Sequence, residues 1–121
     1  MIKTKIQNIP VFRFSVFSDF PGLFDFITTR KGGFSKEPFG EFNMSFYTDE
    51  SDQIIHKNRE KLSGALNLDP SRMIYIKQMH GTEILNITDQ ETDFNTSIQD
   101  AMMTRLKNIC LCVKGADCVP L

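Results

Sequence analysis

The sequence predicts an α+β fold with a mixed β-sheet and few helices. Short segments of alternating or β-branched apolar residues recur along the chain, and one longer segment has the periodicity of an amphipathic helix. The 121 residues are about one domain in length, and 40% hydrophobic content suffices for an ordinary core. We therefore expect one α+β unit.

Two strand candidates lie near the N-terminus. Residues 11–17 (VFRFSVF) alternate between apolar and polar side chains, which is typical of a half-buried strand. A Pro21-Gly22 turn separates them from residues 23–29 (LFDFITT), which are rich in aromatic and β-branched residues. We predict a strand over each range.

A long segment without helical or strand periodicity covers residues 30–50. Glycine and proline interrupt it repeatedly, so neither a helix nor a strand would run through it. Disordered segments usually lack aromatic residues, but this one contains Phe34, Phe39, Phe42, Phe46 and Tyr47. The pattern indicates a functional loop that packs on the protein.

Residues 51–66 form the clearest predicted helix. Their apolar residues fall on one broad face, Asp49 or Ser51 can cap the N-terminus, and Asn67 is a suitable stop. Further strands are predicted over residues 73–77, 82–88 and 109–113, with a polar loop over residues 89–100.

Composition excludes several classes of protein. The formal net charge of −1 provides no general attraction to nucleic acid or to an anionic membrane. No apolar run approaches the roughly 20 residues of a membrane span, and no signal-peptide pattern opens the chain. Three cysteines crowd near the C-terminal end instead of forming a disulfide framework. We expect a cytoplasmic protein with reduced thiols.

Individual residues leave the chemistry open. His80 follows a strand pattern and precedes a glycine turn, so it is either a metal ligand or a histidine satisfied by the backbone. Cys118 follows the last strand, where a thiol can be a ligand, a nucleophile or a small buried side chain. Cys110 and Cys112 share one face of that strand, and we predict core packing for them. Arg30 is either a clamp for an anionic substrate group or a solvated charge.

Six strings in order carry a stronger signal. They are TTRKGGFS, FGEFNMSFYTDE, KNREKL, IKQMHGTEI, DAMMT and GADCVPL, which extend from residue 28 to residue 121. In this order they resemble the YfiH-like family, also called laccase-domain or polyphenol-oxidase-like proteins. The resemblance implies a YfiH-like fold, truncated here: residues 1–121 would be the N-terminal part of a single domain whose C-terminal part is absent.

The resemblance also implies a site. The His of the QxHG string and the Cys of the ADC string would be catalytic zinc ligands, here His80 and Cys118. A second His would come from a string of the H-x-GWRG type, which this chain lacks. From their motif positions, Arg30 and Arg59 are candidates for phosphate contacts and Asn43 for a contact to base or ribose.

The implied activity concerns purine nucleosides and phosphate: phosphorolysis of adenosine, inosine and methylthioadenosine, and deamination of adenosine. A Cys/His₂ zinc with an open position suits this chemistry because it activates water near neutral pH. With two ligands of three, we expect the 121-residue chain to be incomplete and inactive as it stands. The resemblance does not indicate an oligomeric state.

Two other enzymatic interpretations remain. A copper-dependent phenol oxidase would fit the family's other name, but a multicopper enzyme needs several histidine clusters and this chain has two histidines. Copper is nevertheless the alternative metal, because Cu²⁺ outranks Zn²⁺ in intrinsic affinity. The other interpretation is a hydrolase with Cys118 as nucleophile and His80 as base.

Overall fold

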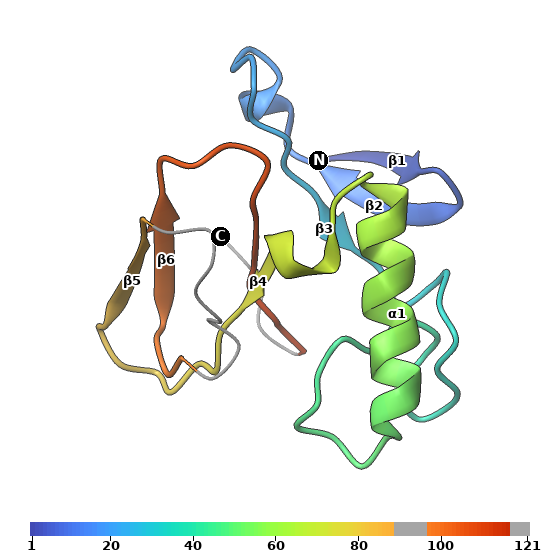
Figure 1. Ribbon diagram of the computed structural model, residues 1–121. Coiled ribbons are helices and arrows are strands. Elements are labelled where there is room, and N and C mark those ends of the chain that lie inside the picture. Colours follow the sequence, from blue (N-terminus) through green and yellow to red (C-terminus); the bar gives the residue numbers. More distant parts are fainter. Residues whose placement is uncertain (89–96, 117–121) are drawn as a thin grey trace. The chain divides into compact units, whose positions relative to one another are not determined.

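The computed structural model describes residues 1–88 and 97–116, shown in Figure 1. The chain divides into two compact units, Met1–Asn67 and Leu68–Leu121. Over the described residues there is one α-helix with two short 3₁₀ helices. The strands form one antiparallel sheet and two parallel pairs. The predicted α+β class is confirmed, whereas the assignment of both units to one domain stays a prediction.

The first unit opens with a hairpin that the sequence analysis did not predict. Strand β1 (Ile2–Ile6) pairs antiparallel with β2 (Ile9–Arg13), and Gln7 in the turn has a left-handed φ of 50°. The short strand β3 (Ile27–Thr28) pairs with the other side of β2. Strand β1 therefore lies at the edge of the sheet, and all of its residues except Ile6 are exposed.

The two predicted N-terminal strands are too long. Strand β2 ends at Arg13, and the 3₁₀ helix η1 (Ser15–Phe17) follows. The Phe14 N–H donates to the Asp25 carboxylate at 2.6 Å, so this backbone group binds a side chain instead of a neighbouring strand. From Phe17 onward the backbone turns through local hydrogen bonds, such as Phe20 N–H to Phe17 O at 3.2 Å. The second predicted strand is thereby reduced to β3.

Helix α1 (Asp52–Ala65) matches the predicted helix to within one residue at each end. Ser51 occupies the N-cap position, but its side chain makes no cap hydrogen bond. Asn67 adopts a left-handed φ of 54° just beyond the helix, as its role of stop residue requires. Buried apolar side chains from the hairpin, the loop and the helix form the core of this unit: Ile6, Ile9, Val11, Phe42, Ile55 and Leu62.

Asn58 is a fully buried polar residue on the apolar face of α1. Its Nδ2 group donates to Ser35 Oγ and to Asn43 O, both at 2.8 Å, and its Oδ1 accepts from Phe34 N–H at 2.8 Å. A Cβ atom at Gly33 would collide with Asn58 Oδ1 at 2.5 Å and with the Phe42 ring. The predicted packed loop, residues 30–50, is therefore fastened to the helix through Asn58, with a glycine where the two approach.

The second unit contains two parallel strand pairs. After the 3₁₀ helix η2 (Pro70–Arg72), β4 (Met73–Tyr75) pairs with β7 (Cys110–Cys112), and β5 (Ile84–Ile87) pairs with β6 (Ala101–Thr104). Three of these strands lie inside the predicted ranges 73–77, 82–88 and 109–113, but β6 was not predicted. Ile74 and Ile87 form a buried cluster with partly buried neighbours: Leu85, Met102, Leu106 and Ile109.

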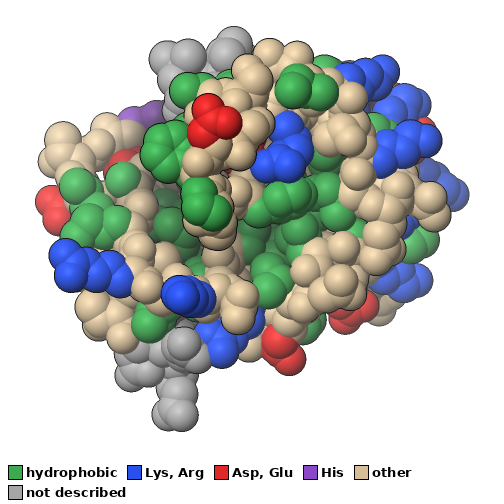
Figure 2. Space-filling view, turned by 90° about the horizontal axis from the view of Figure 1, so that it is seen from above, with side chains coloured by type: hydrophobic (Ala, Val, Ile, Leu, Met, Phe, Trp, Pro, Cys, Tyr) green, Lys and Arg blue, Asp and Glu red, His purple; other side chains and the backbone are tan. Residues whose placement is uncertain are grey.

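Basic, acidic and exposed hydrophobic side chains all occur on the molecular face shown in Figure 2. Within residues 1–88 and 97–116, no helix has the length and apolar character needed to cross a bilayer. The predicted cytoplasmic location is not tested by this finding.

Replacing Asn58 with Ala should lower the free energy of unfolding by about 2–4 kcal/mol, because buried partners in the loop lose their hydrogen bonds. Chemical denaturation measures the change. Gln53→Ala, at an exposed position of the same helix, is the matched control and should change stability by less than about 0.5 kcal/mol. Equal stability of the two variants would contradict the anchoring role of Asn58.

Asp25 should make stability depend on pH. The Phe14 N–H and then the Arg13 guanidinium, 3.1 Å away, lower the pKa of Asp25 below its ordinary value of 3.8. A carboxyl with a lower pKa in the folded state stabilises the protein above its unfolded pKa, and this contribution is lost as pH falls through the folded pKa. The denaturation midpoint of Asp25→Asn should thus fall less steeply between about pH 5 and pH 2 than that of the wild type. Asp19→Asn, at an exposed position in the same segment, is the control.

Candidate active site

His80 lies in a turn after β4, and its backbone conformation is unusual. Its φ of 61° is left-handed, which a non-glycine residue adopts at an energetic cost. The Asp100 carboxylate offsets this cost. Its Oδ1 accepts from the N–H groups of Met79 at 2.8 Å and His80 at 2.7 Å, and its Oδ2 accepts from Gly81 N–H at 2.8 Å. The turn thus places the exposed imidazole of His80 on a fixed backbone.

Asp100 was not predicted as a site residue. The N–H of Gly81, and then those of Met79 and His80, lower the pKa of its carboxyl against the opposing effect of burial, so it remains ionised at neutral pH. A Cβ atom at Gly81 would lie 3.1 Å from Asp100 Oδ2, which makes any larger residue there tight. The only signal in the sequence was the position of Asp100 at the start of the DAMMT string.

The exits of β4 and β7 lie side by side. The two strands are parallel, with Met73 opposite Cys110 and Tyr75 opposite Cys112. Beyond them, Lys114 N–H donates to Gln78 Oε1 at 3.3 Å, which links the chain after β7 to a residue two positions before His80. Lys77 forms a parallel bridge with Ile98, which brings the segment that leads to Asp100 to the same place.

Cys118 lies outside the described residues, so the structure gives no distance between its thiol and His80. Across residues 1–88 and 97–116, no three His, Cys, Asp or Glu side chains are grouped closely enough to hold a metal ion. The described part of the chain therefore contributes one of the predicted ligands, His80. The imidazole of His80 is exposed, and the Asp100 carboxylate holds the backbone of its turn, so the imidazole is accessible to a metal ion.

Arg30 opens the loop in the first unit. Its guanidinium Nη2 is 3.6 Å from Glu37 Oε2 and donates to Pro38 O at 3.4 Å, and 71% of its side chain is exposed. The Arg30 carbonyl accepts from Glu41 N–H at 2.7 Å, so the loop folds back on itself at this residue. An exposed guanidinium on an anchored backbone remains available for the predicted phosphate contact.

Asn43 and Arg59 both hold the loop. The Asn43 amide donates to Thr48 Oγ1 and Glu50 Oε2, each at 2.9 Å, and its Oδ1 accepts from Ser45 N–H at 3.0 Å. The Arg59 Nε and Nη2 groups donate to Met44 O at 3.0 and 2.7 Å. The Arg59 guanidinium also lies 4.3 Å from the centre of the Phe46 ring.

The structure thus places Asn43 in the loop and Arg59 on helix α1, and the side chain of each holds the loop through hydrogen bonds. Their predicted contacts to base, ribose or phosphate are not tested and stay predictions. Arg30, Asn43 and Arg59 belong to the first unit, and His80 to the second. Sequence reasoning missed Asn58, although a polar residue on the apolar face of a predicted helix, between Ile55 and Leu62, was a usable signal.

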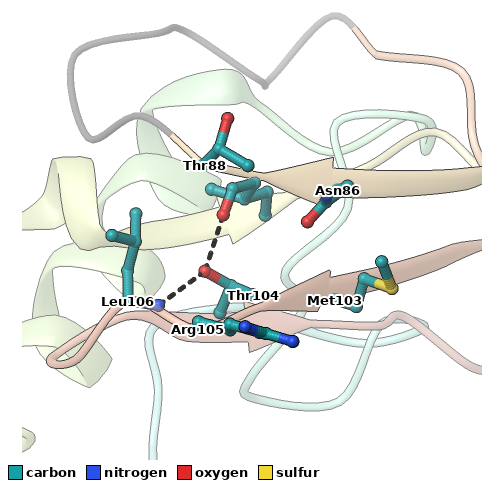
Figure 3. A pocket seen from close by; sticks show the side chains of 7 residues that line it. Asn86, Thr88, Met103, Thr104, Arg105 and Leu106 are labelled. Carbon is teal, nitrogen blue, oxygen red and sulfur yellow. Dashed lines mark hydrogen bonds between the residues drawn. The ribbon is translucent and has the colours of Figure 1, made fainter.

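A cavity of about 610 Å³ lies where β5 and β6 end, as Figure 3 shows. Thr104 lines this cavity and links the two strands at their ends. Its hydroxyl donates to Ile87 O at 2.8 Å and accepts from Leu106 N–H at 3.0 Å. His80 and Asp100 precede these same strands. Since the strands are parallel, the cavity is at the opposite end of the pair from the His80 turn.

Comparison with known proteins shows that this chain is similar to one described family and to several proteins that are named as enzymes. The sequence profile of a family described as multi-copper polyphenol oxidoreductase laccase matches residues 24–121. A purine nucleoside phosphorylase of Corynebacterium glutamicum is 32% identical over 95 residues, which cover 78% of this chain and 39% of that protein. The purine nucleoside phosphorylase YlmD of Bacillus subtilis is 30% identical over 101 residues, which cover 78% of this chain and 36% of that protein.

A solved structure agrees with these sequences. The hypothetical protein YfiH of Bacillus licheniformis superimposes with a TM-score of 0.60 and 26% sequence identity, over 68% of this chain and 33% of that one. The chain spans less than two fifths of the length of the two phosphorylases above, 39% and 36%. The resemblance found in the sequence strings is confirmed, and the chain belongs to the YfiH-like family of multi-copper polyphenol oxidoreductase laccases.

Proposed function

We propose that this chain supplies part of the active site of a zinc-dependent purine nucleoside phosphorylase. His80 and Cys118 are two of its three metal ligands, and a histidine that is not in this chain is the third. The substrates are adenosine, inosine and methylthioadenosine with inorganic phosphate, and deamination of adenosine is a second reaction of the same site. The names of the relatives support the first reaction.

The observation that carries the proposal is that the chain segments that follow β4 and β7 leave the strand pair side by side. His80 follows β4, and Cys118 follows β7 by six positions in the sequence. Parallel strands leave their sheet at one edge, and the Lys114 to Gln78 hydrogen bond keeps the two exits together as far as Lys114. Ligands on two such exits can converge on one ion even though they are far apart in sequence.

Each candidate residue has a proposed task within its own unit. A zinc ion would supply a Lewis acid for the reacting nucleoside. His80 presents its imidazole from the turn that Asp100 fixes, and Asp100 acts through that turn as a positioning residue. Arg30 binds phosphate through its exposed guanidinium, with Arg59 as a second candidate. Asn43 orients the base or ribose if its amide exchanges its contacts within the loop for the substrate.

Two other functions predict different observations. A phenol oxidase would oxidise phenols in proportion to bound copper, and the family description names copper. A hydrolase with Cys118 as nucleophile would keep its activity in the presence of a chelator and lose it on alkylation of the thiol. Nucleoside, phenol and chelator assays on one preparation therefore separate the three enzymatic interpretations.

Replacing His80 with Ala should reduce zinc content and phosphate-dependent release of purine base by at least about 100-fold, because a metal ligand is lost. The assay uses the longest polypeptide that the gene encodes, with inosine, adenosine and methylthioadenosine as separate substrates. His56→Ala is the matched control, because His56 is exposed on α1 and its ring contacts that of Phe46 at a tilt of 58°, with the ring centres 4.8 Å apart. Wild-type base release by His80→Ala, or an equal loss in both variants, would refute the assignment.

Replacing Asp100 with Asn should weaken zinc binding by about tenfold, because an amide cannot accept hydrogen bonds from all three backbone donors of the turn. Competition with a zinc indicator measures the dissociation constant, and circular dichroism reports whether the variant is folded. Asp69→Asn is the matched control, because Asp69 accepts the Ser71 N–H in η2 in the same manner. Unchanged zinc affinity in a folded Asp100→Asn protein would show that the turn does not position His80.

A further inference from the structure

Cys110 and Cys112 form a thiol pair that the proposed function does not use. They are two positions apart on β7, so both side chains are on one face of the strand, and both are half-buried. Their Sγ atoms are 3.6 Å apart, with the Cys112 thiol as donor. The prediction that the two side chains share one face of the strand is therefore confirmed. The predicted core packing is only partial, because both residues are half-buried.

The spacing of the two sulfur atoms matches bidentate chelation. Two thiolates bound to one tetrahedral zinc ion, each at about 2.3 Å, are about 3.8 Å apart. A disulfide bond needs the two atoms at about 2.05 Å, well below the observed separation of 3.6 Å. The observed separation thus already suits a chelated ion and is far from that of a disulfide.

The surroundings of the pair favour soft ligand chemistry. The Cys112 thiol lowers the pKa of the Cys110 thiol by its hydrogen bond, against the opposing effect of burial. Met73 is the register partner of Cys110 on β4, so its thioether side chain projects from the same face of the strand pair. Thiolate and thioether sulfur select thiophilic ions over magnesium or calcium.

We propose that Cys110 and Cys112 chelate a thiophilic metal ion through both sulfur atoms, without using His80 or Cys118 as a ligand. Binding replaces the two thiol protons by one tetrahedral ion of the zinc class. Water or a small thiol completes its coordination, because the strand pair supplies two thiolates. Both proposed ligands lie on β7, and the site does not depend on the proposed phosphorylase activity.

Cadmium titration of the reduced full chain tests the site, because thiolate-to-cadmium absorption in the ultraviolet reports each bound sulfur. Cys118→Ser removes the thiol of the predicted active centre and is the parent for the comparison. This parent should bind one Cd²⁺ with thiolate absorption. Adding Cys110→Ser or Cys112→Ser should weaken binding at least tenfold and remove about half of that absorption. Leu111→Ser in the same parent is the matched control and should bind as the parent does.

Alkylation provides a readout that needs no variant. In the wild-type chain, Cd²⁺ should protect both Cys110 and Cys112 from iodoacetamide at least tenfold, as measured by mass spectrometry of peptides, whereas Ca²⁺ should protect neither. Equal alkylation with and without Cd²⁺ would overturn the proposal. So would a Cys118→Ser chain without thiolate absorption, because the ion would then bind only at Cys118.

Discussion

Because β4 and β7 run parallel, the chain leaves both strands in the same direction, and the candidate centre of the second unit follows from that geometry. A hydrogen bond from Lys114 to Gln78 continues the association beyond the last paired residues. The bridge between Lys77 and Ile98 then delivers Asp100 to the turn that contains His80. Three segments distant in sequence are thus assembled at one edge by a pairing that involves few residues.

A comparable constraint organises the first unit. A long loop without regular structure needs partners for its backbone groups, and burial of those groups would otherwise be costly. Asn58, on helix α1, donates two hydrogen bonds to the loop through its Nδ2 group and accepts one through its Oδ1 atom. A hydrogen bond between Asn43 and Glu50 adds a contact within the loop. Polar residues that appear individually ordinary in the sequence are therefore the structural framework of the loop, which contains two of the substrate-binding candidates, Arg30 and Asn43.

Periodicity predicted the elements that are defined by their own side chains. Helix α1 and the three strands of the second unit that were expected lie within or close to their predicted ranges. The end of β2 could not be predicted, because it depends on the contact between Phe14 and the distant Asp25. Strand β6 was equally hidden, since its exposed and half-buried residues gain their role only by pairing with β5.

The candidate site divides in the same way. His80 and Cys118 are marked by residue type and by the strings around them, so sequence reasoning selects them without a structure. Asp100 acts through backbone N–H groups some twenty positions away, and its place at the start of the DAMMT string does not show that it accepts hydrogen bonds from them. Sequence therefore proposes groups that would act by their own chemistry, and their roles at the site stay predictions, whereas groups that hold the backbone require the fold.

The edge position of β1 has a consequence for the behaviour of the chain in solution. Within residues 1–88 and 97–116, no strand pairs with the outer side of β1, and such an edge can pair through its backbone with the edge of a second molecule. Lys3 and Lys5 alternate with Ile2, Thr4 and Ile6 along this strand. Two such edges brought together would place ammonium groups near one another, and their mutual repulsion would disfavour an intermolecular sheet. The lysines thereby protect the hairpin against aggregation at low salt, and this protection weakens as salt screens their charge.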